Sequence, residues 1–385
     1  VWSGADLPMQ VRRIAGFDAP ELGCEAWNTL ARGVPFRRWE WLRAWWDVYG
    51  LAPTTVVPAC PRALFLLGAF DTTGRLRGLA PLLAETSVWS GRTLMLLGSG
   101  DVCSDYLTLL TARGDEDEVA RAMADWLASA HDEPEQRWDQ LLWSGVAVSD
   151  RVIPGLSNQL AELGHRVWRR PSPSCWRIVL PDTWSDYLAR LSRSHASQIR
   201  RLERRWFETG RAVLRTAETT EQRDEFFATL VDLHQRRRLQ LGQPGCFADS
   251  RFDAFVRRAI EALWPSRAVR LCQLDVDGEP VAAELLLVGH DVLYAYQSGI
   301  APERLESQPG RLLHVALLRQ AIAERRRAFD FLRGDEPYKA HWRAEPLTQL
   351  ELRVASRRGA APLRQDLLRA ATNVKAAMKG ILPRS

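Results

Sequence analysis

Residues 292–342 read VLYAYQSGIAPERLESQPGRLLHVALLRQAIAERRRAFDFLRGDEPYKAHW, and this stretch decides the fold. β-Branched and aromatic residues dominate Val292–Ser298, which predicts a strand. Apolar residues at helical spacing predict an amphipathic helix over Leu312–Arg325. The short apolar run Ala328–Leu332 predicts a second strand. This order predicts a crossover unit with two parallel strands, whose helix begins with amides that are free to bind an anion.

The remainder of the chain indicates two α/β units of similar element order, without an identical sequence repeat. The first contains a hairpin over Ala63–Phe70 and Leu76–Ala84, joined by a turn ending in Gly74. A strand, a helix, a strand and a helix follow it and end near Gly164. The second unit begins near residue 174, and we expect Leu347–Ala355 to close its sheet.

Length and composition favour a two-domain soluble protein. A chain of 385 residues is too long for one core, and 46% hydrophobic with 26% charged residues is ordinary for a globular protein. No apolar run approaches the roughly 18 residues of a membrane span, and no secretory leader opens the chain. Six cysteines without CxxC spacing argue against a zinc site or a disulfide framework. We therefore expect a cytoplasmic protein that binds no metal.

Several motifs together carry a resemblance to a known family. They are Glu40-Trp41-Leu42 with Trp45-Trp46, Ala80–Leu83, Asp105-Tyr106, Leu233-His234 with Arg237, Tyr296–Gly299, Ser307–Leu313, and Phe329–Lys339 with Trp342. The sequence resembles GNAT-superfamily acyltransferases grouped with the CelD-like proteins of cellulose biosynthesis. These are similar in turn to the Fem-type peptidyl transferases, which carry two GNAT-like domains in tandem. The resemblance covers most of the chain and is sharpest from Ser192 to Trp342.

The resemblance implies an α/β (α+β) fold of two tandem GNAT-like domains, each a mixed, mostly antiparallel sheet flanked by helices. We expect an N-terminal domain over residues 1–168, degenerate and on the acceptor side, and a C-terminal acyltransferase domain over residues 169–360. Apolar residues at helical spacing then predict an amphipathic helix within residues 361–385. That helix would either pack on the body or rest on an anionic membrane.

The family's donor is acetyl-CoA or a longer acyl-CoA, whose pantetheine arm lies between two parting parallel strands. Here those strands would be Val292–Ser298 and Ala328–Leu332. The family's pyrophosphate loop is matched only at its first glycine, Gly310, which puts simple acetyl-CoA binding in doubt. Alternatively, Pro309-Gly310 is a plain helix-entry turn. The predicted donor-binding residues are Ser298, Gly299, Gln308, Gly310 and Arg311.

Acyl transfer from a thioester to an amine needs a proton acceptor and a group that polarises the carbonyl. Asp335 is predicted to accept or orient the amine proton, and Tyr338 to return a proton to the leaving thiolate. Lys339 is predicted to stabilise the oxyanion, and only three of the 52 Lys and Arg residues are lysines. The alternatives make Asp335 a helix cap and Lys339 a surface charge.

Two further carboxylates lie in apolar strands, where such groups are unusual. Glu284 either pairs with an arginine or faces the cleft as a general base, and it joins the predicted catalytic set. Asp330 is either a satisfied buried carboxylate or a base. His234 is either structural or an acceptor-binding residue. The predicted acceptor-binding residues are Asp105, Tyr106, His234, Arg237, Arg333 and Trp342.

Residues 190–215 are rich in arginine, and this stretch is either a solvated helix face or a binding surface for a polyanion such as tRNA.

The sequence leaves three candidate functions. The first is an N-acyltransferase acting on a small-molecule, glycan or peptide amine, with exopolysaccharide or cell-envelope metabolism implied by the resemblance. The second is a Fem-type transferase that uses aminoacyl-tRNA. The third is a non-catalytic binding protein with a degenerate GNAT cleft.

Overall fold

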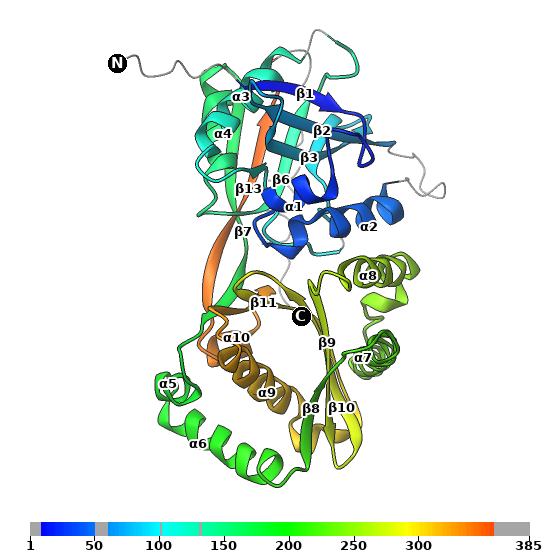
Figure 1. The fold of residues 1–385 in the computed structure, drawn as a ribbon, viewed down its shortest axis with the longest axis vertical. Helices are drawn as coiled ribbons and strands as arrows, with labels where there is room; N and C mark the ends of the chain where they lie inside the picture. The colour runs from blue at the N-terminus through cyan, green and yellow to red at the C-terminus, as the bar shows by residue number, and fades with distance from the viewer. Residues whose placement is uncertain (1–8, 51–60, 101, 131–132, 358–385) are drawn as a thin grey trace, which may run out of the picture.

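In a computed structural model of the chain, the described residues are 9–50, 61–100, 102–130 and 133–357. They form an α/β fold in which a 13-stranded mixed sheet runs through two lobes, with helices against its faces (Figure 1). The predicted fold class is thereby confirmed. The strands are β1 (Gln10–Ile14), β2 (Arg62–Phe70), β3 (Leu76–Ser87), β4 (Gly91–Leu96), β5 (Leu110–Thr111), β6 (Gln140–Ala147), β7 (Arg166–Val179), β8 (Ala212–Thr216), β9 (Val269–Val276), β10 (Glu279–Val288), β11 (Val292–Ile300), β12 (Ala328–Arg333) and β13 (Glu345–Ala355).

The helix predicted over Leu312–Arg325 is confirmed, although it begins three residues earlier, at Pro309. Helix α6 continues directly into a π-helical turn over Glu203–Phe207. The α-helices are α1 (Cys24–Leu30), α2 (Trp39–Tyr49), α3 (Glu116–Ser129), α4 (Val152–Glu162), α5 (Trp184–Arg190), α6 (Arg193–Leu202), α7 (Thr220–Gln240), α8 (Ser250–Leu263), α9 (Pro309–Ala323) and α10 (Pro337–His341). The helix predicted within residues 361–385 lies outside the described residues.

The order of strands across the sheet shows that the two halves repeat one topology. The order is β1-β2-β3-β4-β6-β13-β7-β12-β11-β10-β9-β8, so each half contributes an antiparallel series followed by a parallel crossover. The last strands of the two halves are exchanged, because β13 pairs with β6 and β7 pairs with β12. The expectation that Leu347–Ala355 closes the second sheet is therefore wrong.

Strands β7 and β13 pair with each other along most of their length and run as two long arms between the lobes (Figure 1). The predicted boundary between residues 168 and 169 falls inside β7. The partner of β7 is β13, which lies far along the chain, and local periodicity does not identify such a distant partner. The two lobes thus share their central strands instead of meeting through a linker.

The parallel strands β11 and β12 pair at three positions only, from Val292 opposite Ala328 to Tyr294 opposite Asp330. Beyond these positions the strands part, as expected. The first half repeats this feature, since β4 and β6 also pair at three positions, from Thr93 opposite Gln140 to Met95 opposite Leu142. Each half therefore contains a place where the sheet opens.

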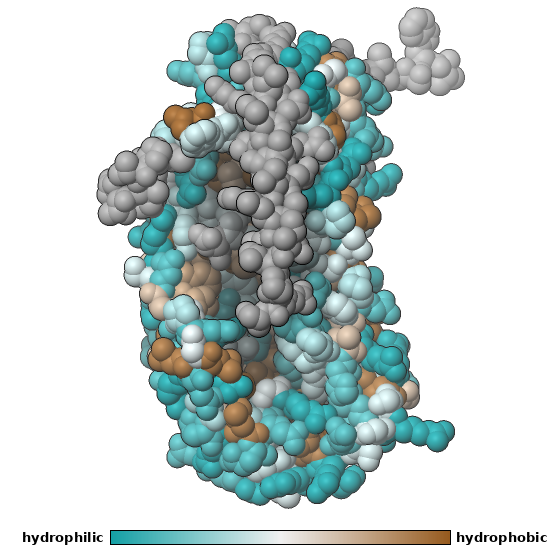
Figure 2. All heavy atoms as spheres, turned by 180° about the vertical axis from the view of Figure 1, so that it is seen from behind, coloured by the Kyte–Doolittle hydropathy of each residue, from teal (hydrophilic) through white to brown (hydrophobic). Residues whose placement is uncertain are grey.

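Helices α7 and α9 lie against opposite faces of the second half of the sheet (Figure 1). Seen from behind, the described surface is largely hydrophilic with hydrophobic residues in small groups (Figure 2). Within the described residues no helix combines the length and the apolar character that crossing a bilayer requires.

Candidate functional site: a cleft where two strands part

A cavity of about 500 Å³ opens where β11 and β12 separate. Its walls come from both faces of the sheet, because α7 supplies one side and α9 the other. The predicted site residues that line it are Glu284, Ser298, Gly299, Gly310, Arg311, His234, Arg237, Tyr338 and Trp342. Residues from six separate elements and loops therefore meet in one cleft. The other predicted site residues do not line it; they are Asp105, Tyr106, Gln308, Arg333, Asp335 and Lys339.

Glu284 is the buried acidic residue of this cleft. It lies on β10 opposite Ser298 of β11 and is 2% exposed. Within the described residues its Oε2 has no hydrogen-bond partner, and no arginine forms an ion pair with it. Burial raises the pKa of Glu284 well above its usual value. Of the two alternatives, pairing with arginine is excluded for the described residues, and the carboxyl faces the cleft.

The N-terminus of α9 presents its backbone to the cleft. Gln308 precedes the helix in the left-handed conformation (φ 56°) and provides no side-chain cap. Pro309 carries no amide hydrogen, and the amides of Arg311 and Leu312 donate to the Gln308 carbonyl oxygen at 2.9 and 3.1 Å, so Gly310 has the first amide of the helix that can meet a ligand. A Cβ at Gly310 would meet only Ile300 Cγ2, at 3.9 Å, so this turn is open on the cleft side. Such a helix end suits a phosphate group.

Arg311 adds a cation to this helix end. Its guanidinium donates to Gln308 Oε1 at 3.0 Å and to Gln198 Oε1 of α6 at 2.8 Å. Neither partner is charged, and no ion pair of Arg311 occurs within the described residues. The positive charge therefore remains available to an anion in the cleft.

The corresponding helix of the first half has the opposite charge. Helix α3 carries Glu116, Asp117 and Glu118 in its first turn, whereas α9 has no acidic residue there. Carboxylates at a helix N-terminus occupy the positive end of the helix dipole and repel another anion. The two halves share a topology, but only the second has a helix end suited to phosphate.

An aromatic wall completes the cleft. The His314 ring stacks on Tyr338 with centroids 5.7 Å apart and meets Trp342 edge-on at 5.6 Å. Burial lowers the pKa of His314 to about 4, so the ring is neutral at pH 7. His314 escaped the sequence analysis, although its position one helical turn after Gly310 on α9 is a signal that could have found it.

Tyr338 stays protonated at neutral pH. Although 44% of the residue is exposed, its pKa is raised, first by burial and then by the nearby carboxyls of Glu284 and Glu336. A phenol in this state is a proton donor. Its place beside Glu284 in one cleft gives the site an acid next to a candidate base.

Lys339 lies beneath the turn that follows β12, not in the cleft wall. It is 2% exposed, and its Nζ donates to the backbone carbonyls of Leu332, Arg333 and Gly334 at 2.9–3.1 Å. Glu336 lies 2.8 Å from the same atom. An ammonium has three donors, and all are engaged here. The surface-charge alternative is wrong, and the geometry favours a positioning role over oxyanion binding.

Asp335 accepts a hydrogen bond from Trp176 Nε1 at 3.1 Å and does not line the cleft. The residue preceding α10 is Glu336, and no side chain caps that helix. The helix-cap alternative for Asp335 is therefore wrong. Its proposed part in proton transfer remains a prediction.

Asp105 and Arg333 hold the two lobes together. Arg333 Nε donates to Asp105 Oδ1 at 2.5 Å, and its Nη2 donates to the Ser104 carbonyl at 2.9 Å. Close by, the Tyr106 hydroxyl donates to Asp330 at 2.6 Å. These residues lie outside the cleft.

Asp330 is a satisfied buried carboxylate. It is fully buried and also accepts from Arg177 Nε and from the Leu332 amide, both at 2.7 Å. This arrangement agrees with the structural alternative, since every oxygen has a donor.

His234 lies on the α7 side of the cleft. Its Nδ1 is 3.1 Å from Gln235 Oε1, and its Nε2 is 3.7 Å from Cys246 Sγ. Burial lowers the pKa of His234. Arg237, one turn nearer the end of α7, is bonded to Gln240 and also lines the cleft. Among the described side chains no group of three His, Cys, Asp or Glu residues is placed to hold a metal ion.

Comparisons with known proteins agree with this geometry. The sequence model of the family described as "Acetyltransferase (GNAT) domain" matches residues 193–340, which contain every residue that lines the cleft except Trp342. No curated protein matches the chain in sequence. The CelD-like grouping stays a prediction.

Solved structures resemble the chain over most of its length. FemX superposes with a TM-score of 0.53 at 10% identity, over 80% of this chain and 95% of that chain. A Bacteroides thetaiotaomicron protein of unknown function gives 0.52 at 12% identity, over 87% and 98%. The C-terminal domain of an Agrobacterium fabrum protein described as a lysylphosphatidylglycerol synthetase gives 0.50 at 10%, over 90% and 95%. At these identities the likeness shows the fold alone.

Proposed function

We propose that the protein is an N-acyltransferase that moves an acyl group from an acyl thioester of CoA to an amine. The observation that carries this proposal is Glu284, a buried carboxyl without a partner among the described residues. It shares a cleft with the open N-terminus of α9 at the point where two parallel strands part. The match of residues 193–340 to the GNAT domain family supports the same assignment.

The residues of the cleft divide the chemistry among them. Bound acyl-CoA would supply the activated carbonyl, with its phosphates near the amide of Gly310 and the guanidinium of Arg311. Glu284 would take the proton from the attacking amine as the new C–N bond forms. Tyr338 would give a proton to the sulfur as the C–S bond breaks. A carboxyl whose pKa is raised by burial is a stronger base than an exposed one, which suits this role.

This function is tested by incubating the protein with acetyl-CoA and longer acyl-CoAs across a panel of amines. Free CoA and the acylated amine are measured together by liquid chromatography with mass spectrometry. We expect equal amounts of the two products. If none of the donor and acceptor pairs releases CoA, the acyltransferase assignment fails.

A glycine pair tests the donor site separately from turnover. Gly310→Ala is expected to leave the fold intact, because its Cβ meets no atom closer than 3.9 Å. The methyl group would keep a phosphate from the backbone, so CoA affinity should fall roughly 10–100-fold, the worth of one or two charge-assisted hydrogen bonds. Calorimetric titration with CoA measures the change.

Gly299→Ala is the contrasting variant, at a cleft glycine that packs closely against α7. Its Cβ would lie 2.6 Å from the His234 amide nitrogen and 2.7 Å from the Leu230 carbonyl oxygen. We expect this variant to lose about 1–3 kcal/mol of stability through overpacking. Unchanged CoA affinity in a well-folded Gly310→Ala protein would contradict the proposed phosphate site.

A second function is favoured by the basic surface of α6. Five exposed arginines lie on this helix and its π-helical turn, and none forms an ion pair within the described residues. They are Arg193, Arg200, Arg201, Arg204 and Arg205. The Gln198–Arg311 hydrogen bond places this surface beside the end of α9. A donor carried on tRNA would suit such a surface.

The tRNA alternative predicts salt-sensitive binding that distinguishes charged from uncharged tRNA. Replacing Arg200 and Arg204 by Glu should weaken that binding at least tenfold, because each phosphate contact adds to the salt-dependent term. Gel-shift titration at low and moderate salt is the measurement. No shift at low salt would remove this alternative.

A further inference from the structure

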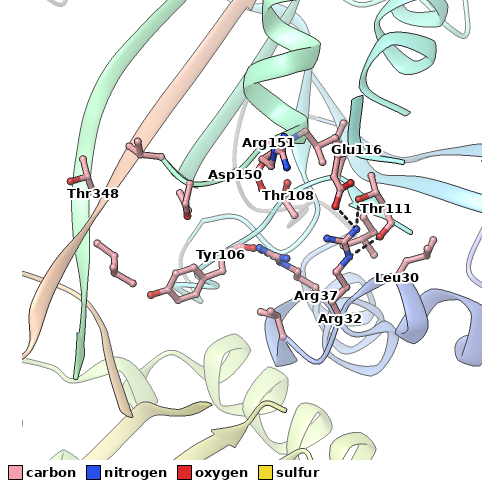
Figure 3. A pocket seen from close by; sticks show the side chains of 18 of the residues that line it. Leu30, Arg32, Arg37, Tyr106, Thr108, Thr111, Glu116, Asp150, Arg151 and Thr348 are labelled. Carbon is pink, nitrogen blue, oxygen red and sulfur yellow. Dashed lines mark hydrogen bonds and ion pairs between the residues drawn. The ribbon is translucent and has the colours of Figure 1, made fainter. Parts of the chain in front are cut away.

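A second cavity of about 650 Å³ lies between the lobes and shares no residue with the cleft (Figure 3). Both halves of the chain build it, since its walls include the ends of β6 and β13, the segment around β5, and Tyr294 of β11. The side chains that the argument below uses are Arg37, Thr108, Asp150, Arg177 and Tyr294. None of them belongs to the predicted site.

Arg37 supplies a partly used guanidinium to this cavity. Its Nε donates to the Tyr106 carbonyl at 2.5 Å, and within the described residues neither Nη atom has a hydrogen bond or an ion pair. Burial lowers the pKa of Arg37, and nearby Asp150 opposes that effect without forming an ion pair with it. A half-buried guanidinium with a free edge is a strong donor for a carboxylate or a phosphate.

Thr108 provides an independent sign of a missing partner. The residue is 5% exposed, lines the cavity, and its Oγ1 has no hydrogen-bond partner among the described residues. A buried hydroxyl without a partner is unfavourable, and native proteins rarely retain one without cause. Tyr294 also lines the cavity, and no hydrogen bond joins its hydroxyl to another described residue.

The charges around the cavity favour an anion. Four arginines and two acidic residues line it: Arg32, Arg37, Arg151, Arg177, Glu116 and Asp150. Arg32 is paired with Glu116 at 2.8 Å, and Arg177 with buried Asp330 at 2.7 Å. Asp150 Oδ1 accepts from the amides of Val152 and Ile153. Within the described residues these pairings leave Arg37, which is half-buried, and the exposed Arg151 without an ion pair.

We propose that this interlobe cavity binds the anionic group, carboxylate or phosphate, of a small molecule, held by the guanidinium of Arg37 and the hydroxyl of Thr108. The site does not depend on acyl transfer in the cleft. Its ligand class is a small anion-bearing molecule with polar groups that reach Tyr294.

The test measures binding of sodium phosphate and of sodium succinate at constant ionic strength, by calorimetry and by the shift in melting temperature. All proteins carry Arg311→Gln, so that the end of α9 does not contribute. We expect one of the two anions to bind and to raise the melting temperature. The anion that binds identifies the ligand as a phosphate or a carboxylate. Absence of binding by both anions overturns the proposal.

Arg37→Gln should weaken this binding at least tenfold, whereas Arg258→Gln, which removes an exposed arginine from α8, should leave it unchanged. If Arg37→Gln folds poorly, Thr108→Val provides a second test of the site. Because the hydroxyl has no partner among the described residues, Thr108→Val should not lower the melting temperature of the free protein. It should, however, lower the affinity for the anion severalfold. A lower melting temperature with unchanged anion affinity would show a structural threonine and contradict the site.

Discussion

Replacing Glu284 by Gln is expected to reduce kcat by about 10²–10⁴-fold while leaving CoA affinity unchanged, because the amide cannot accept the amine proton. The substitution preserves shape in a position that is 2% exposed. Steady-state kinetics with the acceptor found in the amine screen, together with CoA titration, separate the two effects. Glu279→Gln, at the exposed start of the same strand, is the matched control and should retain full activity.

The same substitution is expected to stabilise the protein at neutral and alkaline pH. Burial raises the pKa of Glu284 in the folded state above its unfolded value. The unfolded chain therefore loses this proton first, and the folded state loses stability as pH rises from the unfolded pKa towards the folded one. Glutamine removes that loss. Melting curves at pH 5 and pH 8 should show a gain for Glu284→Gln that is larger at pH 8.

The pH profile of the wild-type enzyme follows from the same carboxyl. A base works only when ionised, so kcat/KM should rise with pH through the raised pKa of Glu284. If Glu284→Gln retains wild-type kcat, Glu284 is not the base. If Glu284→Gln still binds its ligand and no acyl transfer is found with any amine, the result favours the non-catalytic binding protein.

Lys339→Met is expected to destabilise the protein by about 3–5 kcal/mol, the usual effect of removing one member of a buried charged network. Three backbone carbonyls would lose their donor at once. Leu332 and Gly334, two of these carbonyl residues, have positive φ angles of 59° and 115°, so this turn depends on the ammonium. Chemical denaturation of the full chain measures the loss.

Lys339→Arg separates positioning from charge. A planar guanidinium does not fit a pocket of three converging carbonyls, so we expect this variant to lose stability as well, although the charge remains. Glu336→Gln, which removes the exposed partner, should cost under about 1 kcal/mol. A Lys339→Met protein of wild-type stability with a large loss in kcat would restore the oxyanion role.

The elements of the cleft were largely predictable because each depends on local pattern. The strand over β11, the helix α9 and the strand β12 follow from β-propensity and helical spacing within about 40 residues. Glu284 stood out because a carboxylate in an apolar run is rare. The pattern did not show whether Glu284 pairs with an arginine, because such a partner could come from any part of the chain.

The roles of Asp105, Arg333 and Lys339 could not be predicted in this way. The Asp105–Arg333 pair joins residues 228 positions apart, and the exchange of β7 and β13 pairs strands from different halves. Sequence motifs identified these polar residues as unusual but did not distinguish a substrate contact from an interlobe contact. The interlobe cavity was missed for the same reason, because Arg37 and Thr108 carry no local signal.

The sequence by itself determined the order of strands and helices, the place where two parallel strands meet, and most of the side chains that line the cleft. Tertiary structure alone decided which end strand completes which half, that Lys339 supports a turn from beneath, and that Arg37 faces a cavity without a counter-ion. The physical reason is that periodicity reports only whether a side chain is buried. Its partners are set by contacts between residues far apart in the chain, and those partners fix its charge state and its role.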